Sequence, residues 1–114
     1  MSTGKDYVDD ILQKYRVVMF SKSSSPDATK AQVVFDHYNF KKGDYFFIDM
    51  DNRDDCEEME KYVHEISGHD TVPFIFIDGQ FYGNADDLIV GEKLDTFDER
   101  LNGASIHFDK KPMH

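Results

Sequence analysis

The stretch VVMFSKSSSPDATKA, residues 17–31, decides the fold of this chain. Its apolar run at 17–20 predicts a short strand that is buried on both faces. A polar loop follows, and Ser25 with Pro26 predicts a helix start, because serine is a favoured N-cap and proline a favoured first helical residue. We expect this helix to reach about residue 38, with an inner face formed by Ala31, Val34, Phe35 and Tyr38.

The flanking segments extend this unit into an α/β domain. Apolar periodicity and turn signals predict helices at 3–15, 49–67 and 84–101, and strands at 45–50, 73–78 and 80–82. A strand–helix–strand unit implies a parallel pair with a right-handed crossover, and the turn at Asp78–Gly79 predicts an antiparallel hairpin. We therefore expect a small four-stranded mixed sheet with helices on both faces, in one domain at 1–103, followed by a flexible tail at 104–114.

Caps and apolar stripes set the expected helix ends. Thr3 and Asn84 are favoured N-cap residues, and Gly68 is a favoured C-cap because glycine adopts the left-handed conformation without steric cost. The last helix is expected to face inward with Leu88, Ile89, Leu94, Phe97 and Leu101.

The composition limits the classes of function. Hydrophobic residues make up 39% and aromatic residues 14% of the 114 residues, which argues against intrinsic disorder. With 23 acidic against 13 basic residues, the formal net charge is −10, so we expect no nucleic-acid partner. Cys56 is the single cysteine, so no intramolecular disulfide can form. The N-terminal segment has no apolar signal region and no apolar run is long enough to span a membrane, so we expect a cytoplasmic monomer without a membrane partner.

Three sequence blocks carry a family resemblance. VVMFSKSSSP resembles the first strand and active-site loop of the glutaredoxins, FSK-x-x-C-P-Y-C. TVPFIFIDG resembles their TVP-x-x-FI-x-G block, and GNADDL resembles their GG-C-DDL block. Because the three blocks occur in the family's order and spacing over about residues 5–103, the resemblance implies a thioredoxin-like fold, with Pro73 in the cis form.

The resemblance also locates two missing thiols. Ser25 and Ala28 occupy the positions of the family's nucleophilic and resolving cysteines. Only a thiolate attacks a disulfide, and a hydroxyl oxygen cannot form the mixed disulfide, so we expect no catalytic residue in this loop and no thiol–disulfide turnover. Iron–sulfur cluster carriage, which some family members perform through this cysteine, loses its protein ligand as well. A purely structural interpretation is that Ser25 and Pro26 are an ordinary helix start.

The resemblance further implies a groove for glutathione or a peptide. The residues that match the family's binding positions are Lys22, Ser25, Thr71, Val72, Pro73, Ala85, Asp86 and Asp87. Lys22 would hold the glycyl carboxylate, but Glu60 and Asp27 add nearby negative charges that each cost about 0.5–1 kcal/mol. We therefore expect weak glutathione binding, no obligatory cofactor, and a binding or regulatory module whose partner is glutathione, a peptide or another protein.

Two enzymatic alternatives remain. Ser25 could stabilise a glutathione thiolate with its hydroxyl, as in some thioredoxin-fold glutathione transferases. Cys56 could act as a redox thiol, although its acidic neighbours disfavour the thiolate and we expect it to lie outside the groove.

Metal-binding patterns are incomplete. Residues 49–60 place carboxylates at several positions of a calcium loop, but Arg53 and Asp54 stand where a ligand and a glycine are needed. The histidines lack zinc-site spacing, so we expect no metal.

Overall fold

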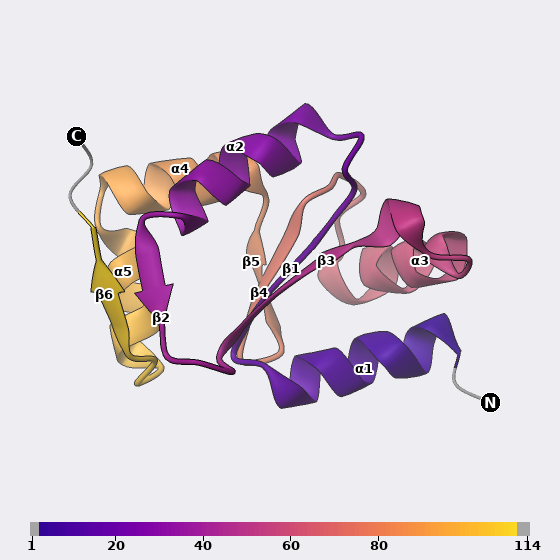
Figure 1. Ribbon diagram of the computed structural model, residues 1–114, viewed down its shortest axis with the longest axis horizontal. Coiled ribbons are helices and arrows are strands. Elements are labelled where there is room, and N and C mark those ends of the chain that lie inside the picture. Colours follow the sequence, from indigo (N-terminus) through magenta and orange to yellow (C-terminus); the bar gives the residue numbers. More distant parts are fainter. Residues whose placement is uncertain (1–2, 112–114) are drawn as a thin grey trace.

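The computed structural model describes residues 3–111 and contains the expected α/β architecture (Figure 1). Its helices are α1 (Gly4–Lys14), α2 (Pro26–Phe35), α3 (Cys56–Ser67), α4 (Ala85–Lys93) and α5 (Thr96–Gly103), with a short 3₁₀ turn η1 (Met50–Asn52). Its strands are β1 (Val17–Ser21), β2 (Tyr38–Phe40), β3 (Tyr45–Asp49), β4 (Phe74–Ile77), β5 (Gln80–Gly83) and β6 (Phe108–Lys110).

The main sheet is mixed and has the strand order β3-β1-β4-β5. Strand β1 pairs in parallel with β3 and antiparallel with β4, and β4 continues antiparallel into β5. Asp78 and Gly79 both have positive φ, at 51° and 78°, which is the backbone of the two-residue hairpin turn that their sequence predicts. The predicted parallel pair and hairpin are thus confirmed.

Helices cover both faces of this sheet (Figure 1). Helices α1 and α3 pack over one face, where Val18, Phe20, Phe74 and Phe76 belong to one apolar cluster. Helices α2 and α4 pack over the other face, where Val17, Met19, Ile75 and Ile77 belong to a second cluster. Successive strand residues point to opposite faces, which is why the continuous apolar runs of β1 and β4 supply both clusters.

Local capping signals place the helix ends. The Thr3 and Asn84 side chains both form capping boxes at the starts of α1 and α4. Gly68 ends α3 with φ 74° in the left-handed region, as predicted. Helix α3 starts at Cys56, later than expected, because the acidic segment before it forms the separate turn η1.

The expected single helix at 84–101 is wrong, because it is broken into α4 and α5. Asp95 adopts the left-handed conformation with φ 62°, and Leu94 is 64% exposed instead of facing inward. A continuous helix advances about 100° per residue, so Leu88 and Phe97 would face opposite sides. The break at Asp95 turns the chain and lets both side chains be fully buried.

The segment expected to be a flexible tail is packed against the domain as far as residue 111. Ile106 is 2% exposed, and β6 pairs antiparallel with β2. Strand β2 itself occupies residues that we expected to end the second helix, which instead stops at Phe35. Alternating apolar side chains on the two strands pack together, with the Tyr38 and Phe108 rings 5.5 Å apart. Residues 112–114 of the expected tail lie outside the described residues.

Candidate functional site

Strand register brings the three motif segments to one end of the sheet. Phe20 pairs with Phe74, so the loop after β1 begins beside the Val72–Pro73 peptide. Ile75 pairs with Gly83, so the start of α4 lies next to the same peptide. The Val72–Pro73 peptide bond is cis, as the family resemblance implied. The loop between β1 and α2 and the start of β4 lie together near the top of Figure 1.

The Ser25 side chain is a helix cap. Its Oγ accepts a hydrogen bond from the Ala28 backbone N–H at 3.3 Å, and its own N–H donates to the Lys22 carbonyl at 2.9 Å. Pro26 follows as the first helical residue. Ala28 is buried, with 6% exposure. The two positions that carry cysteines in the FSK-x-x-C-P-Y-C motif are therefore Ser25, whose hydroxyl caps the helix, and Ala28, whose methyl group is buried.

Lys22 forms an ion pair with Glu60 from α3. The Lys22 Nζ and Glu60 Oε1 atoms lie 2.7 Å apart, and each side chain is about a quarter exposed. The hydrogen bond to Glu60 is the main cause of a raised Lys22 pKa. From sequence we expected Glu60 to repel a ligand carboxylate at a distance; the structure shows that Glu60 binds the lysine directly. A ligand carboxylate must therefore compete with Glu60 for Lys22.

Two aspartates hold the backbone of the loop. The Ser23 N–H donates to Asp49 Oδ1 and the Ser24 N–H to Asp51 Oδ2, each at 2.9 Å. The Ser24 backbone hydrogen bond is the main cause of a lowered Asp51 pKa. Sequence reasoning missed this role, although the parallel pairing of Ser21 with Asp49 is a consequence of the predicted parallel strands and places the two segments side by side.

The first turn of α4 has fewer free hydrogen-bonding groups for a ligand than its sequence suggested. Asn84 and Asp87 exchange side-chain and backbone hydrogen bonds of 3.0 and 3.1 Å in the capping box. Ala85 is buried at 2% exposure, whereas Asp86 is exposed. A ligand amine would thus meet an Asp87 carboxylate that already accepts a backbone hydrogen bond.

Thr71, Val72 and Pro73 form the third side of this end of the sheet. Thr71 is exposed, Val72 is half-buried and Pro73 is buried. All eight predicted groove residues therefore lie on the loop, before β4 or at the start of α4. A cavity of about 250 Å³ near the loop includes Lys22 and Ser25, but its lining contains neither residues 71–73 nor residues 85–87.

Comparison with known proteins identifies the family. Residues 17–82 match the family model described as Glutaredoxin. The chain belongs to the glutaredoxin family. Glutaredoxin-1 of Rhizophagus irregularis is 35% identical over 92 residues, which cover 81% of this chain and 88% of that relative. Glutaredoxin-1 of Oryctolagus cuniculus is 31% identical over 86 residues, covering 75% and 81%.

Solved glutaredoxin structures share the fold. Oxidized glutaredoxin 2 from Chlamydomonas reinhardtii superposes with a TM-score of 0.77 at 27% identity, covering 90% of this chain and 94% of that one. A buckwheat glutaredoxin–glutathione complex has a TM-score of 0.78 at 20% identity, with 90% of each chain covered, and supports the fold alone. The thioredoxin-like glutaredoxin fold expected from the sequence is thereby confirmed.

The single thiol of this glutaredoxin-family chain lies at the start of α3. Cys56 is half-buried and packs on the cluster beneath α1 and α3. Burial is the main cause of a raised Cys56 pKa; the Lys22 charge opposes the shift and Glu60 adds to it. Because these charges act on the thiol, Cys56 is closer to the loop than we expected, yet its thiolate is disfavoured at neutral pH.

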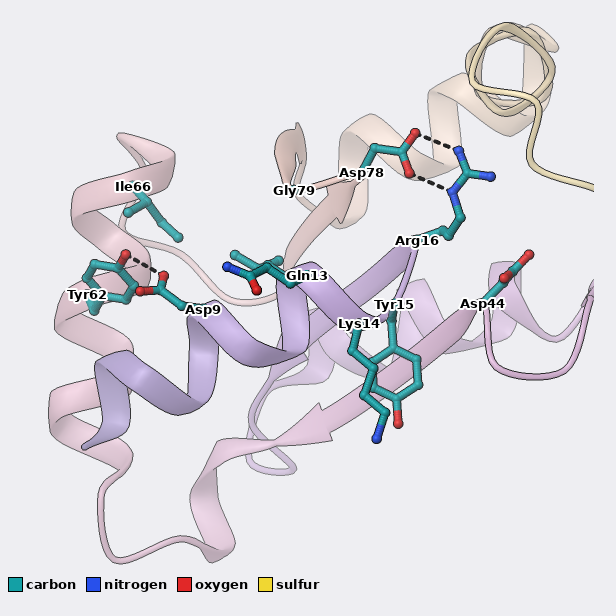
Figure 2. A pocket seen from close by; sticks show the side chains of 11 residues that line it. Asp9, Gln13, Lys14, Tyr15, Arg16, Asp44, Tyr62, Ile66, Asp78 and Gly79 are labelled. Carbon is teal, nitrogen blue, oxygen red and sulfur yellow. Dashed lines mark hydrogen bonds and ion pairs between the residues drawn. The ribbon is translucent and has the colours of Figure 1, made fainter. Parts of the chain in front are cut away.

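A larger cavity of about 700 Å³ lies between α1, α3 and the β4–β5 turn and includes none of the predicted groove residues (Figure 2). Two pairs of its polar side chains bind each other. Arg16 makes two hydrogen bonds of 2.7 and 2.9 Å with the Asp78 carboxylate, and the Tyr62 hydroxyl donates to Asp9 at 2.6 Å. The bond to Asp9 raises the pKa of Tyr62 to about 12. Four of the polar side chains that border the cavity are therefore already paired.

Two further findings concern metals and membranes. Within residues 3–111, no group of three or more histidine, cysteine or carboxylate side chains is arranged to hold a metal ion. In the same residues, the helices are too short or too polar to cross a membrane.

Proposed function

We propose that this glutaredoxin-family chain is a binding or regulatory module that performs no thiol–disulfide turnover through its loop. The observation that carries the proposal is the cap at Ser25, whose Oγ accepts the Ala28 N–H where a nucleophilic sulfur would be needed. Disulfide exchange requires a sulfur that bonds covalently to the substrate sulfur, and oxygen cannot take this part. Ala28 likewise offers no resolving thiol.

The groove retains part of the machinery for binding an extended ligand. Val72 directly precedes the cis proline and lies beside the loop, which supports pairing of its peptide group with the backbone of a peptide or of glutathione. A buckwheat protein with the same fold has been solved as a glutaredoxin–glutathione complex, which makes glutathione a reasonable ligand class to test.

Charge makes this binding weak for glutathione. The Lys22–Glu60 pair must open, or be shared, before Lys22 can hold a ligand carboxylate. A partly exposed pair of this kind is worth about 0.5–1 kcal/mol, so the competition lowers affinity about two- to fivefold. The negative charge of Asp27 acts in the same direction on a glutathione carboxylate, so we expect weak binding.

The proposal is tested by restoring the missing sulfur. A glutathione-dependent disulfide reductase assay compares the natural chain with Ser25→Cys, with Ser24→Cys as the matched control one residue away. We expect no turnover from the natural chain or from Ser24→Cys. Turnover by Ser25→Cys would show that the groove is otherwise competent and that the absence of sulfur at position 25 alone prevents the reaction. Substantial turnover by the natural chain would overturn the proposal.

A transferase-like reaction is the second candidate, because one feature of Ser25 favours it. Its Oγ accepts a hydrogen bond from Ala28, which leaves the hydroxyl proton free to donate to a glutathione sulfur. Conjugation of glutathione to a model electrophile, lost in Ser25→Ala, would support this activity. A conjugation rate equal to that without protein would rule out the transferase-like reaction.

A further inference from the structure

The outer strand β3 presents an open hydrogen-bonding edge. It ends the sheet order β3-β1-β4-β5, with β1 as its single neighbour. The Val17 N–H donates to the Asp44 carbonyl at 2.8 Å, so the peptide group of Asp44 points toward β1. Alternate residues of a strand direct their N–H and C=O groups to opposite sides, so the peptide groups of Tyr45 and Phe47 point away from β1. Phe47 is also 40% exposed. An unpaired edge with an exposed aromatic side chain is a template for adding another strand.

Two cavities lie between α2 and this edge and share one residue. The first, of about 250 Å³, is bordered by Ala28, Thr29 and Phe47. The second, of about 390 Å³, is bordered by Tyr45 and the segment Lys41–Gly43. Gln32 borders both cavities. The two hollows therefore follow one another along the β3 edge, one beside Phe47 and the other beside Tyr45.

Two buried polar atoms at these cavities have no partner among residues 3–111. Gln32 uses its Nε2 to bind Asp36 at 3.2 Å, but its buried Oε1 accepts no hydrogen bond. The buried Tyr45 hydroxyl also lacks a partner. An unpaired buried polar atom is unfavourable, so each atom gains if a side-chain rearrangement on binding gives it a partner.

The charge at the second cavity specifies the ligand. Lys41 and Lys42 are exposed, and neither forms an ion pair within the described part of the chain. Lys111 borders the same cavity. Although the whole chain carries −10, charges farther away than about 8 Å are screened at physiological salt, so the local lysines dominate here. Asp36 borders this cavity too, but the three lysines outnumber it, so a carboxylate is the favoured ligand group.

We propose that the β3 edge binds an extended, acidic segment of a partner protein as an added fifth strand. An apolar side chain of the segment enters the cavity beside Phe47, and a carboxylate reaches Lys41 and Lys42. A second copy of this chain is a poorer occupant, because two molecules of net charge −10 repel each other. The surface adjoins the glutathione groove at one end, because Lys22 and Ser25 also border the first cavity, but neither cavity includes residues 71–73 or the start of α4.

The test uses the full chain labelled with ¹⁵N and a short capped peptide of alternating threonine and valine that ends in two aspartates. A control peptide ends in two lysines. We expect added hydrogen-exchange protection at the Tyr45 and Phe47 amides, and about tenfold tighter binding of the acidic peptide, since two exposed ion pairs at about 0.7 kcal/mol each give that ratio. The double variant Lys41→Glu, Lys42→Glu should reverse the preference, and Thr29→Trp should weaken both peptides by filling the first cavity.

Four results would overturn the inference. The first is equal affinity for the two peptides, and the second is no protection along β3 at millimolar acidic peptide. The third is concentration-dependent dimerisation that protects the same β3 amides without any peptide, which would make a second copy the occupant. Peptide-induced shifts confined to Val72 would also contradict the edge site while leaving the groove proposal intact.

Discussion

Replacing Glu60 by glutamine isolates the contribution of one ion pair to ligand binding. The substitution removes a carboxylate whose Oε1 lies 2.7 Å from Lys22 Nζ and keeps nearly the same side-chain volume. Both side chains are about a quarter exposed, so solvent screening holds the pair at about 0.5–1 kcal/mol. Freeing Lys22 by that amount should tighten glutathione binding about two- to fivefold.

The assay is a titration of glutathione into ¹⁵N-labelled chain, followed through the amides of Lys22 and Val72. Glu57→Gln is the matched control. Glu57 is exposed on the first turn of the same helix, and its substitution by glutamine removes the same charge. The gain for Glu60→Gln should shrink as salt is added, since the pair is partly exposed. Equal affinity of Glu60→Gln and Glu57→Gln would refute the competition between Glu60 and the ligand carboxylate.

Three further outcomes follow from single contacts. Asn84→Ala removes the capping box of α4 and should lower the free energy of unfolding by about 1 kcal/mol in urea titrations, whereas Asn102→Ala on an exposed site should leave it unchanged. Ile106→Ala should cost about 2–4 kcal/mol in the same assay, because the side chain is 2% exposed; a cost near zero would mean that the segment after α5 does not contribute to the fold. Alkylation of Cys56 should be slow at pH 7 and should accelerate only above the pH at which ordinary thiols ionise, because the Cys56 pKa is raised. Lys22→Met should slow the reaction further, since the Lys22 charge favours the thiolate. Rapid reaction at pH 7 would contradict the burial of the thiol.

Features set by neighbouring residues could be predicted from the sequence. The capping boxes at Thr3 and Asn84, the C-cap at Gly68 and the Asp78–Gly79 turn each depend on a few adjacent residues. The strands predicted at 17–20 and 73–78 are observed at Val17–Ser21 and Phe74–Ile77, because both carry continuous apolar runs between turn signals.

Features set by distant pairing could not be predicted. The break at Asp95 depends on burying Leu88 and Phe97 on the same core, and the β2–β6 pair joins segments about seventy residues apart. Helical periodicity favoured a longer second helix, but pairing of Tyr38 and Phe40 with the C-terminal strand overrides it. Their alternation with polar Asn39 was the available signal.

In the candidate site, too, features set by neighbouring residues could be predicted and contacts between distant segments could not. The positions of Ser25, Pro73 and Asp87 were predicted from three short motifs. The repulsion of a ligand carboxylate by Glu60 stays a prediction. The direct pair of Glu60 with Lys22 could not be predicted, since it requires the relative placement of α3 and the loop. The carboxylates of Asp49 and Asp51, which suggested an incomplete calcium loop, instead bind the amides of Ser23 and Ser24.

The most direct measurement of the central claim is the rate at which the unaltered chain transfers glutathione from a glutathionylated peptide to free glutathione. With a capping hydroxyl at Ser25 and a raised pKa at Cys56, the predicted rate equals that of the buffer alone, with no glutathione adduct on the protein by mass spectrometry. A rate well above the buffer that disappears in Cys56→Ser would contradict the account, because it would place a working thiol on α3.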